Sequence, residues 1–300
     1  MANDGATQTA QLQQMQNGAG FIAALDQSGG STPKALGLYG VTPDAWSDDA
    51  GMFAQMQKMR ARIILADDFT SAKVIGAILF ERTMDETIEG KQVAEFMWSE
   101  RGVVPFLKID KGLEGEANGV QMMKDIPDLA DTLARAKGLG VYGTKMRSVI
   151  NTADATGIEG LVAQQFEVAK EVIAAGLMPI IEPEINIHSD TKAAAEVLMK
   201  SAIATQLDAL PEGQGVMLKL TIPDQANLYS DLSDHPRVIR IVALSGGYST
   251  DDACARLSRN DTMIASFSRA LTEGLNVSMS DAVFNSALGS NIDKIYQASV

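Results

Sequence analysis

Short runs of apolar residues recur eight times along the chain, and each run stops at charged, glycine or serine residues. Strands of a parallel sheet give this pattern, because helices cover both faces of the sheet and leave few polar positions. Segments with a helical spacing of apolar residues separate most of the runs. The expected strands are residues 20–25, 74–80, 103–109, 141–147, 177–184, 216–221, 238–244 and 263–267.

The helical segments carry recognisable start and stop signals. Ser249, followed three residues later by Asp252, resembles a capping box, and Gly138 and Gly176 stand where helices would end. An additional helix is expected in the long segment between the first two strands. The expected helices are residues 49–65, 127–137, 158–175, 190–210, 250–259 and a final one that starts near Ser268.

Eight strands that alternate with helices indicate an α/β fold, the (β/α)8 TIM barrel. A doubly wound open sheet shows the same alternation and stays open as the competing fold. One barrel commonly uses about 250 residues. We therefore expect the 300 residues to form a single domain, residues 1–300, with a short polar N-terminal segment and a C-terminal helical tail.

Composition narrows the classes of function. The net charge of −13 disfavours nucleic acid and anionic membranes as partners, because both are polyanions. Residues 1–18 lack the parts of a secretory signal, and no apolar run approaches the ~20 residues that span a bilayer. The single cysteine, Cys254, favours a cytoplasmic protein. With His188 and His235 as the only histidines, no metal site is expected. A homo-oligomer is compatible with the sequence.

Charged residues gather at the ends of the expected strands. Side chains two positions apart in a strand point to the same side, and barrel enzymes place their chemistry at the carboxyl ends of the strands. Five strands have charged residues at this position, so a chance arrangement is improbable. The residues concerned are Asp26, Lys108, Asp110, Lys145, Arg147, Glu182, Glu184 and Lys219.

Lys219 is the one charge in the apolar run of residues 215–221. The run alone leaves two interpretations open, a salt-bridged structural lysine or an amine kept neutral to attack a carbonyl. Crowded lysines repel one another, and burial acts in the same direction, so we expect the pKa of a lysine in this cluster to be lowered. A lysine with a pKa lowered from ~10.4 to about 7 to 8 is a nucleophile near neutral pH.

Two small-residue turns are candidate anion sites. Residues 245–247 follow the seventh strand and residues 268–269 follow the eighth, a neighbourhood that binds phosphate in many barrels. Residues 28–31 offer a second cradle after the first strand. Two phosphate sites on either side of a reactive lysine would suit a sugar bisphosphate.

Six motifs occur in order along nearly the whole chain. They are Leu25-Asp26-Gln27-Ser28, Lys108-Ile109-Asp110-Lys111-Gly112, Gly143-Thr144-Lys145-Met146-Arg147, Pro179-Ile180-Ile181-Glu182-Pro183-Glu184, Leu218-Lys219 and Leu244-Ser245-Gly246-Gly247. In this order and spacing they resemble class I (Schiff-base) fructose-1,6-bisphosphate aldolase, in its bacterial-type branch. The resemblance implies a (β/α)8 barrel that cleaves fructose 1,6-bisphosphate to dihydroxyacetone phosphate and glyceraldehyde 3-phosphate in glycolysis, without a metal, with small-molecule sugar phosphates as partners.

The resemblance also implies roles for individual residues. Lys219 would form the Schiff base, Glu182 would handle the protons of carbinolamine dehydration, and Asp26 would act on the C4 hydroxyl. Lys145 and Glu184 would support the electrostatics. The implied binding residues are Ser245, Gly246 and Arg269 for the dihydroxyacetone phosphate end, Lys108, Arg147, Ser28 and Ser31 for the other end, and Gly247 and Ser268 in the same phosphate-binding set.

Several positions depart from the family pattern. Gln27 stands where an acidic residue is familiar, and Ser268 stands where a glycine is often found. The chain ends at Val300 without the terminal tyrosine of the animal enzymes, and Tyr296 is the nearest candidate for that role. The competing functions are another Schiff-base aldolase or transaldolase acting on a sugar monophosphate, and a non-catalytic barrel scaffold.

Overall fold

Eight parallel strands curl into a barrel at the centre of the structure, a computed structural model that describes residues 5–29 and 31–300. Neighbouring strands pair in the order β1-β2-β5-β7-β8-β9-β10-β11. The first and last strands meet where Ala24 N donates to Phe267 O at 3.2 Å. The strands are β1 (Phe21–Leu25), β2 (Val74–Leu79), β5 (Val104–Lys108), β7 (Gly143–Ile150), β8 (Met178–Ile185), β9 (Val216–Thr221), β10 (Val238–Leu244) and β11 (Met263–Ala265). The predicted (β/α)8 barrel is confirmed over the open sheet.

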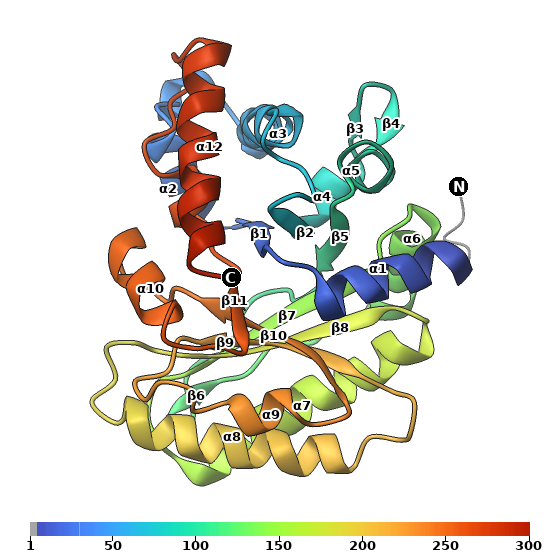
Figure 1. Cartoon of the computed structure of the whole chain (residues 1–300), viewed down its shortest axis with the longest axis vertical. Helices are drawn as coiled ribbons and strands as arrows, with labels where there is room; N and C mark the ends of the chain where they lie inside the picture. The colour runs from blue at the N-terminus through green and yellow to red at the C-terminus, as the bar shows by residue number, and fades with distance from the viewer. Residues whose placement is uncertain (1–4, 30) are drawn as a thin grey trace.

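Helices follow most of the strands and pack on the outside of the barrel (Figure 1). Four begin at a residue whose side chain accepts a hydrogen bond from a first-turn backbone N–H, namely Asp48, Asp154, Ser249 and Ser280. The predicted cap at Ser249 and the additional helix between the first two strands are confirmed. The outer helices are α3 (Asp49–Leu65), α4 (Glu81–Met84), α5 (Val93–Arg101), α6 (Leu129–Gly138), α7 (Ala155–Ala174), α8 (Lys192–Asp208), α9 (Ser230–Ser233), α10 (Thr250–Leu257), α11 (Arg269–Thr272) and α12 (Asp281–Gln297).

Short elements fill the connections between strands and helices. An antiparallel hairpin follows β2, and another short strand pairs antiparallel with the end of β7. A helix and a 3-10 turn precede α3. These elements are β3 (Thr87–Ile88) and β4 (Lys91–Gln92) in the hairpin, β6 (Val120–Gln121), α2 (Ser31–Leu38) and η1 (Pro43–Ala45).

The N-terminal segment forms helix α1 (Gly5–Asn17), where the sequence predicted only a polar segment. Gln14 Nε2 donates to Ile75 O and to Gly102 O, both at 2.7 Å, and Met15 is fully buried in the cluster that fills the barrel. These partners lie near the starts of β2 and β5, so α1 covers the amino end of the barrel. This helix has a weak apolar pattern, because it buries only a narrow stripe of its surface, Gln11 and Met15.

The C-terminal region forms two helices, not the one predicted to start near Ser268. The short α11 ends at Thr272, and α12 begins at Asp281 after a turn that contains Gly274, where φ is +72°. Arg62 of α3 forms an ion pair with Asp281 at 3.0 Å and lies over the ring of Phe284. The C-terminal helix therefore packs against α3, far along the sequence.

One of the two predicted helix-ending glycines has that role. Gly176 follows α7 with a left-handed φ of +78°. Gly138 is instead the last residue of α6, and Gly140, with φ +88°, takes the left-handed position two residues later.

The inward face of the barrel changes from apolar to polar toward the carboxyl ends of the strands. On β8, Ile180 belongs to the apolar cluster inside the barrel, while Glu182 and Glu184 line a pocket two and four residues later. On β9, Met217 and Lys219 repeat the change. Because alternate residues of these strands point inward, charged side chains lie at one end of a barrel whose interior is otherwise apolar.

Candidate active site

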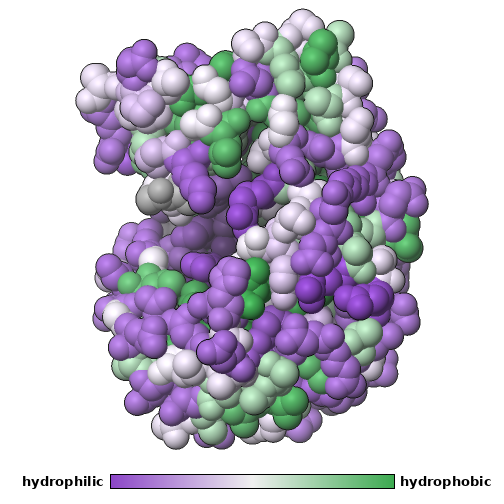
Figure 2. Space-filling model, turned by 90° about the vertical axis from the view of Figure 1, so that its left-hand side faces the viewer, coloured by the Kyte–Doolittle hydropathy of each residue, from purple (hydrophilic) through white to green (hydrophobic). Residues whose placement is uncertain are grey.

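A pocket of about 780 Å³ opens at the carboxyl ends of the strands. Residues at the ends of all eight barrel strands line it, from Asp26 after β1 to Ser268 after β11. Figure 2 shows a hollow lined by hydrophilic residues on this side of the molecule. A concave polar pocket at this end is the usual place of catalysis in a barrel.

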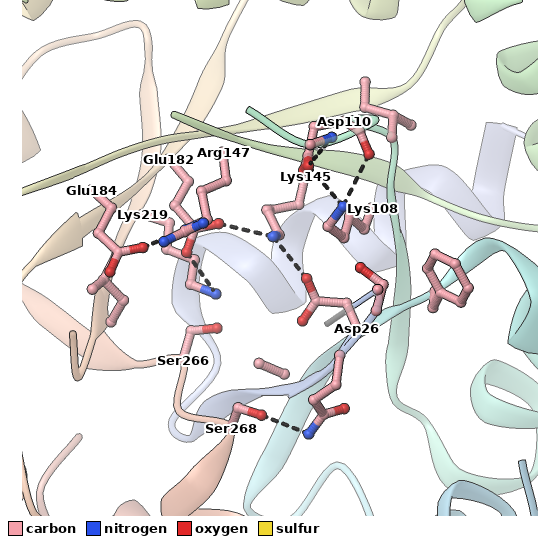
Figure 3. Close-up of a pocket in the computed structure, with 18 of the residues that line it drawn as sticks. Asp26, Lys108, Asp110, Lys145, Arg147, Glu182, Glu184, Lys219, Ser266 and Ser268 are labelled. Carbon is pink, nitrogen blue, oxygen red and sulfur yellow. Dashed lines mark hydrogen bonds and ion pairs between the residues drawn. The ribbon is translucent and has the colours of Figure 1, made fainter. Parts of the chain in front are cut away.

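Four charged side chains form a chain of contacts across the pocket floor (Figure 3). Lys219 Nζ lies 3.1 Å from Glu182 Oε1, and the other oxygen of Glu182 lies 2.9 Å from Lys145 Nζ. Lys145 Nζ also lies 2.7 Å from Asp26 Oδ2. Two ammonium groups and two carboxylates thus alternate, and each of the two lysines and Glu182 is at least 95% buried at the side chain.

The order of charges sets the protonation of the chain. Burial acts to lower the pKa of Lys145, but Asp26 and Glu182, with Asp110 further away, outweigh burial and raise that pKa above its ordinary value. The prediction that crowding lowers lysine pKa values is therefore wrong for Lys145. Burial acts to raise the pKa of Asp26 and of Glu182, but Lys145 and Lys219 outweigh it and lower both. Lys145 is consequently a fixed cation between two ionised carboxylates.

Glu182 and Lys219 face each other where their two strands separate. The ladder between β8 and β9 pairs only Ile180 with Met217 and Ile181 with Leu218. Beyond it, Thr221 Oγ1 bridges the strands by accepting from Ile185 N at 2.8 Å and donating to Ile185 O at 3.0 Å. The bridge joins the two strands beyond the point where their ladder ends.

Gln165 of α7 fixes the backbone that carries Glu182. Its Oε1 accepts from Glu182 N at 2.8 Å, and its Nε2 donates to Ser148 Oγ at 2.9 Å. Gln165 is fully buried, so solvent does not compete for these hydrogen bonds. This residue connects the outer helix layer to the pocket floor, and the sequence did not single it out.

Two further ion pairs lie at the rim on the side of β5 and β7. Lys108 Nζ donates to Asp110 Oδ1 at 2.7 Å and to Asp110 O at 2.9 Å. Arg147 Nε donates to Glu184 Oε2. Burial acts to lower the pKa of Arg147, but Glu184 outweighs it and raises the pKa. Both cations point into the pocket and can exchange a carboxylate for a bound anion.

The turn after β10 is shaped for an anion. Gly246 and Gly247 have φ values of +58° and +131°, and a Cβ on Gly246 would lie 2.7 Å from Ile187 Cγ2. Only glycine fits these two positions without strain. A Cβ on Gly247 would lie 3.8 Å from Arg269 Nη2, so the arginine reaches over the turn. Backbone N–H groups and guanidinium groups are common phosphate partners, so this turn is a candidate phosphate site.

The structure brings together most of the residues that the sequence singled out. Gly247 adjoins the lining, at the turn that Arg269 covers. The side chain of Ser31 lies outside the described residues, although its backbone begins α2. The predicted residues that line the pocket are Asp26, Ser28, Lys108, Lys145, Arg147, Glu182, Glu184, Lys219, Ser245, Gly246, Ser268 and Arg269.

Comparison of the sequence with known proteins points to one family. The family model for class I fructose-bisphosphate aldolase matches residues 7–224. The class 1 fructose-bisphosphate aldolase of Synechocystis sp. is 54% identical over 290 residues, which cover 97% of each chain. The chain belongs to the class I fructose-bisphosphate aldolases. The enzyme of the same description from Porphyromonas gingivalis is 53% identical, covering 97% of this chain and 98% of its own.

Solved aldolase structures share the barrel. The fructose-bisphosphate aldolase of Plasmodium falciparum superposes with a TM-score of 0.69 at 19% identity, covering 98% of this aldolase and 92% of that chain. An archaeal fructose-1,6-bisphosphate aldolase, solved with its catalytic lysine covalently bound to a carbinolamine intermediate, gives a TM-score of 0.51 at 12% identity, covering 95% and 99%. At these identities the likeness concerns the fold alone.

Sequence reasoning missed one polar residue that lines this aldolase pocket and another that lies behind it. Ser266 is buried and lines the pocket two positions before Ser268 on the same inward face. Arg60 of α3 is 1% exposed and donates to the backbone oxygen of Gln27. A signal for Arg60 existed, because it falls on the helix face that buries Met56 and Ile63. A lone arginine on such a face needs polar partners.

Tyr296 lies away from the aldolase pocket and does not line it. It belongs to the end of α12, and Asp293, one turn earlier, contacts Lys73 just before β2 begins. This end of α12 is therefore near the amino ends of the strands, opposite the chemistry. The suggestion that Tyr296 replaces the terminal tyrosine of the animal enzymes is wrong, because the direction of α12 carries it to the other side of the barrel.

Metal and membrane features were also sought in the described part of the aldolase. Within residues 5–29 and 31–300, no three His, Cys, Asp or Glu side chains are grouped so that they could hold a metal ion. Over the same residues, no helix combines the length and apolar character that crossing a bilayer would take.

Proposed function

We propose that this aldolase cleaves fructose 1,6-bisphosphate reversibly to dihydroxyacetone phosphate and glyceraldehyde 3-phosphate through a Schiff base on Lys219. The observation that carries the proposal is the contact of Lys219 Nζ with Glu182 Oε1 at 3.1 Å on the pocket floor. Lys145, the other buried amine, lies between two carboxylates and stays protonated. An ammonium has no lone pair, so Lys145 cannot attack, and Lys219, whose proton Glu182 can accept, is the nucleophile of the pair.

Glu182 would move the protons of imine formation. Its lowered pKa keeps it ionised in the free enzyme, so it can first take a proton from the Lys219 ammonium. The neutral amine then attacks the substrate C2 carbonyl, and a carbinolamine forms. Glu182 returns the proton to the carbinolamine hydroxyl, which leaves as water, and the cationic iminium remains.

Asp26 would start the cleavage of the C3–C4 bond. It accepts the proton of the C4 hydroxyl, the C4 oxygen becomes an aldehyde, and the electron pair of the broken bond moves into the iminium as an enamine. Lys145, 2.7 Å from Asp26 Oδ2, keeps this carboxylate ionised and positioned. Protonation of the enamine at C3 and hydrolysis of the imine would release dihydroxyacetone phosphate.

The two ends of the substrate would bind to different walls. Ser245, Gly246 and Gly247 with Arg269 suit the phosphate next to the reacting ketone. Lys108 and Arg147, with Ser28, suit the other phosphate, because each cation can trade its present carboxylate partner for phosphate oxygens. Glu184 would hold Arg147 until substrate enters.

No metal is needed in this scheme, because the iminium accepts the electron pair that a metal would otherwise stabilise. We propose a metal-independent, cytoplasmic enzyme in accordance with its two histidines and single cysteine. A homo-oligomeric assembly stays a prediction.

Reductive trapping tests the proposal directly. The protein is incubated with dihydroxyacetone phosphate and borohydride, and peptide mapping locates the adduct. We expect one adduct per chain, on Lys219, and cleavage of fructose 1,6-bisphosphate that survives a chelator. An adduct on Lys108 or Lys145 would refute the assignment of the nucleophile. Faster cleavage of deoxyribose 5-phosphate than of the bisphosphate would refute the substrate.

A further inference from the structure

The barrel wall has a weak seam between its first and last strands. Each of the other neighbouring pairs is joined by a ladder, whereas in residues 5–29 and 31–300 no ladder joins β1 and β11. A backbone bond from Ala24 N to Phe267 O, at 3.2 Å, joins the two strands near their carboxyl ends. The relative position of these two strand ends is thus poorly fixed by the main chain.

Side chains cross the seam above that point. Gln27, the second residue after β1, donates through Nε2 to Ser268 Oγ at 2.7 Å. Gln27 and Ser268 are two of the positions at which the sequence departs from the family pattern. The departures are therefore not independent, because the two side chains form one hydrogen bond.

Arg60 sets the orientation of this contact from behind. Its Nη2 donates to Gln27 O and lies 3.5 Å from Gln27 Oε1, and its Nη1 donates to Thr83 Oγ1 at 2.7 Å. A guanidinium has only donors, so the amide oxygen of Gln27 must face it and the amide nitrogen must face Ser268. Ser268 Oγ is consequently the acceptor.

The seam separates two groups that the proposed reaction uses. Asp26 precedes Gln27, and Arg269 follows Ser268. If one strand end moved relative to the other, the distance between Asp26, the proposed base for the C4 hydroxyl, and Arg269, the proposed phosphate ligand, would change. Small errors of that kind are costly, because cleavage needs the reacting groups held in place.

We propose that Arg60, Gln27 and Ser268 are positioning residues that clamp the seam and so fix Asp26 relative to Arg269. This inference rests on the proposed function, since it concerns how well the same site works. The clamp holds the segment after β1, which carries Asp26, against the segment after β11, which carries Arg269. Its effect on substrate binding therefore depends on the presence of Arg269. A residue that only stabilised the fold would show no such dependence.

Kinetics of paired variants test the clamp. Gln27→Met keeps the length of the side chain and removes the donor, and Ser268→Ala removes the acceptor. We expect each to lower kcat/KM for fructose 1,6-bisphosphate by roughly 3- to 10-fold, the scale of one neutral hydrogen bond. The double variant should be no worse than Gln27→Met alone, because that change already removes the contact that Ser268→Ala removes.

The dependence on Arg269 is the decisive readout. In an Arg269→Ala background, Gln27→Met should change KM by less than about twofold, because the group it positions is gone. Ser268→Thr, which keeps a hydroxyl, should lose less kcat/KM than Ser268→Ala. Equal effects of Gln27→Met with and without Arg269, or multiplied losses in the double variant, would overturn the clamp.

Controls separate the clamp from folding and from the proposed function. Gln297→Met and Ser258→Ala make the same changes at exposed positions and should leave kcat/KM unaltered. Stoichiometric trapping of dihydroxyacetone phosphate on Lys219 shows that a variant is folded. If the Gln27→Met protein formed no trapped adduct, the test would be the kcat/KM of Ser268→Ala compared with that of Ser268→Thr. Equal values for those two variants would refute the clamp. A parent that neither cleaves nor traps would instead refute the proposed function.

Discussion

Lys219 and Glu182 face each other at 3.1 Å, just beyond the last paired residues of β8 and β9. Only two residue pairs join these strands, and the same register would next bring Glu182 opposite Lys219. Both side chains line the pocket inside the barrel. A proton can pass between them without either group leaving its strand.

Replacing Glu182 by glutamine tests this proton transfer. Glu182→Gln keeps the shape but cannot accept a proton from Lys219 or return it to a carbinolamine, so turnover should fall roughly 10²-fold or more. Steady-state cleavage of fructose 1,6-bisphosphate measures the change. Glu171→Gln, at an exposed position of α7, is the matched control. Turnover within about twofold of the parent would contradict the role.

Lys145 should control the acid limb of the pH profile. It lowers the pKa of both Asp26 and Glu182, so in Lys145→Met both values should rise and both groups should take up protons at a higher pH. We expect kcat/KM of the variant to fall off at a higher pH than in the parent as the solution is acidified. Profiles from pH 4 to 7, with Lys58→Met as an exposed control, measure this shift.

The same shifts predict the direction of stability changes with pH. The lowered carboxyl pKa values contribute stability above the unfolded values, ~3.9 for Asp and ~4.3 for Glu, that is lost as the pH falls through the lower folded values. The free energy of unfolding of the parent should therefore drop in acid. Lys145→Met should flatten that drop. Parallel pH curves for parent and variant would show that Lys145 does not hold these carboxylates ionised.

Periodicity predicted where the charged side chains lie, but not which of them touch. The spacing of two put Glu182 and Glu184 on one face, and Lys145 and Arg147 on another strand's face, and all four line the pocket. The sequence suggested lysines crowding one another, whereas Lys145 lies between carboxylates. Such pairings depend on how the barrel closes, which no local pattern encodes.

The residues missed in the sequence act over long separations. Arg60 reaches Gln27 from 33 positions away, and Gln27 reaches Ser268 across 241 positions. The position of Arg60 among the buried residues of α3 was a usable signal, since an arginine there must find acceptors. The contact between Gln27 and Ser268 could not be read from spacing, because it exists only once the first and last strands are neighbours.

Arg269 should contribute mainly to binding. It lies over the glycine turn after β10, where a phosphate would meet backbone N–H groups, and this contact is the same before and during the reaction. Arg269→Ala should raise KM for fructose 1,6-bisphosphate by about 10- to 100-fold, the scale of a charge-assisted hydrogen bond, with a smaller change in kcat. Arg259→Ala removes an exposed arginine and serves as control. An unchanged KM would count against the site.

The covalent step separates the two buried lysines. Lys219→Met should abolish trapping by dihydroxyacetone phosphate and borohydride and leave the barrel folded, because an apolar side chain of similar length relieves a buried charge. Glu182 would still be paired with Lys145 at 2.9 Å, so no carboxylate is left without a cation. Lys145→Met should still trap on Lys219, but more slowly, since the cation that keeps Glu182 ionised for proton transfer is gone.

Mass spectrometry of the trapped protein over time distinguishes the two variants. The expected pattern is no adduct for Lys219→Met and a slow adduct on Lys219 for Lys145→Met, while urea unfolding confirms that both are folded. A stoichiometric adduct on Lys219→Met would place the nucleophile elsewhere. Loss of trapping in Lys145→Met alone would instead make Lys145 the attacking amine, which its position between Asp26 and Glu182 argues against.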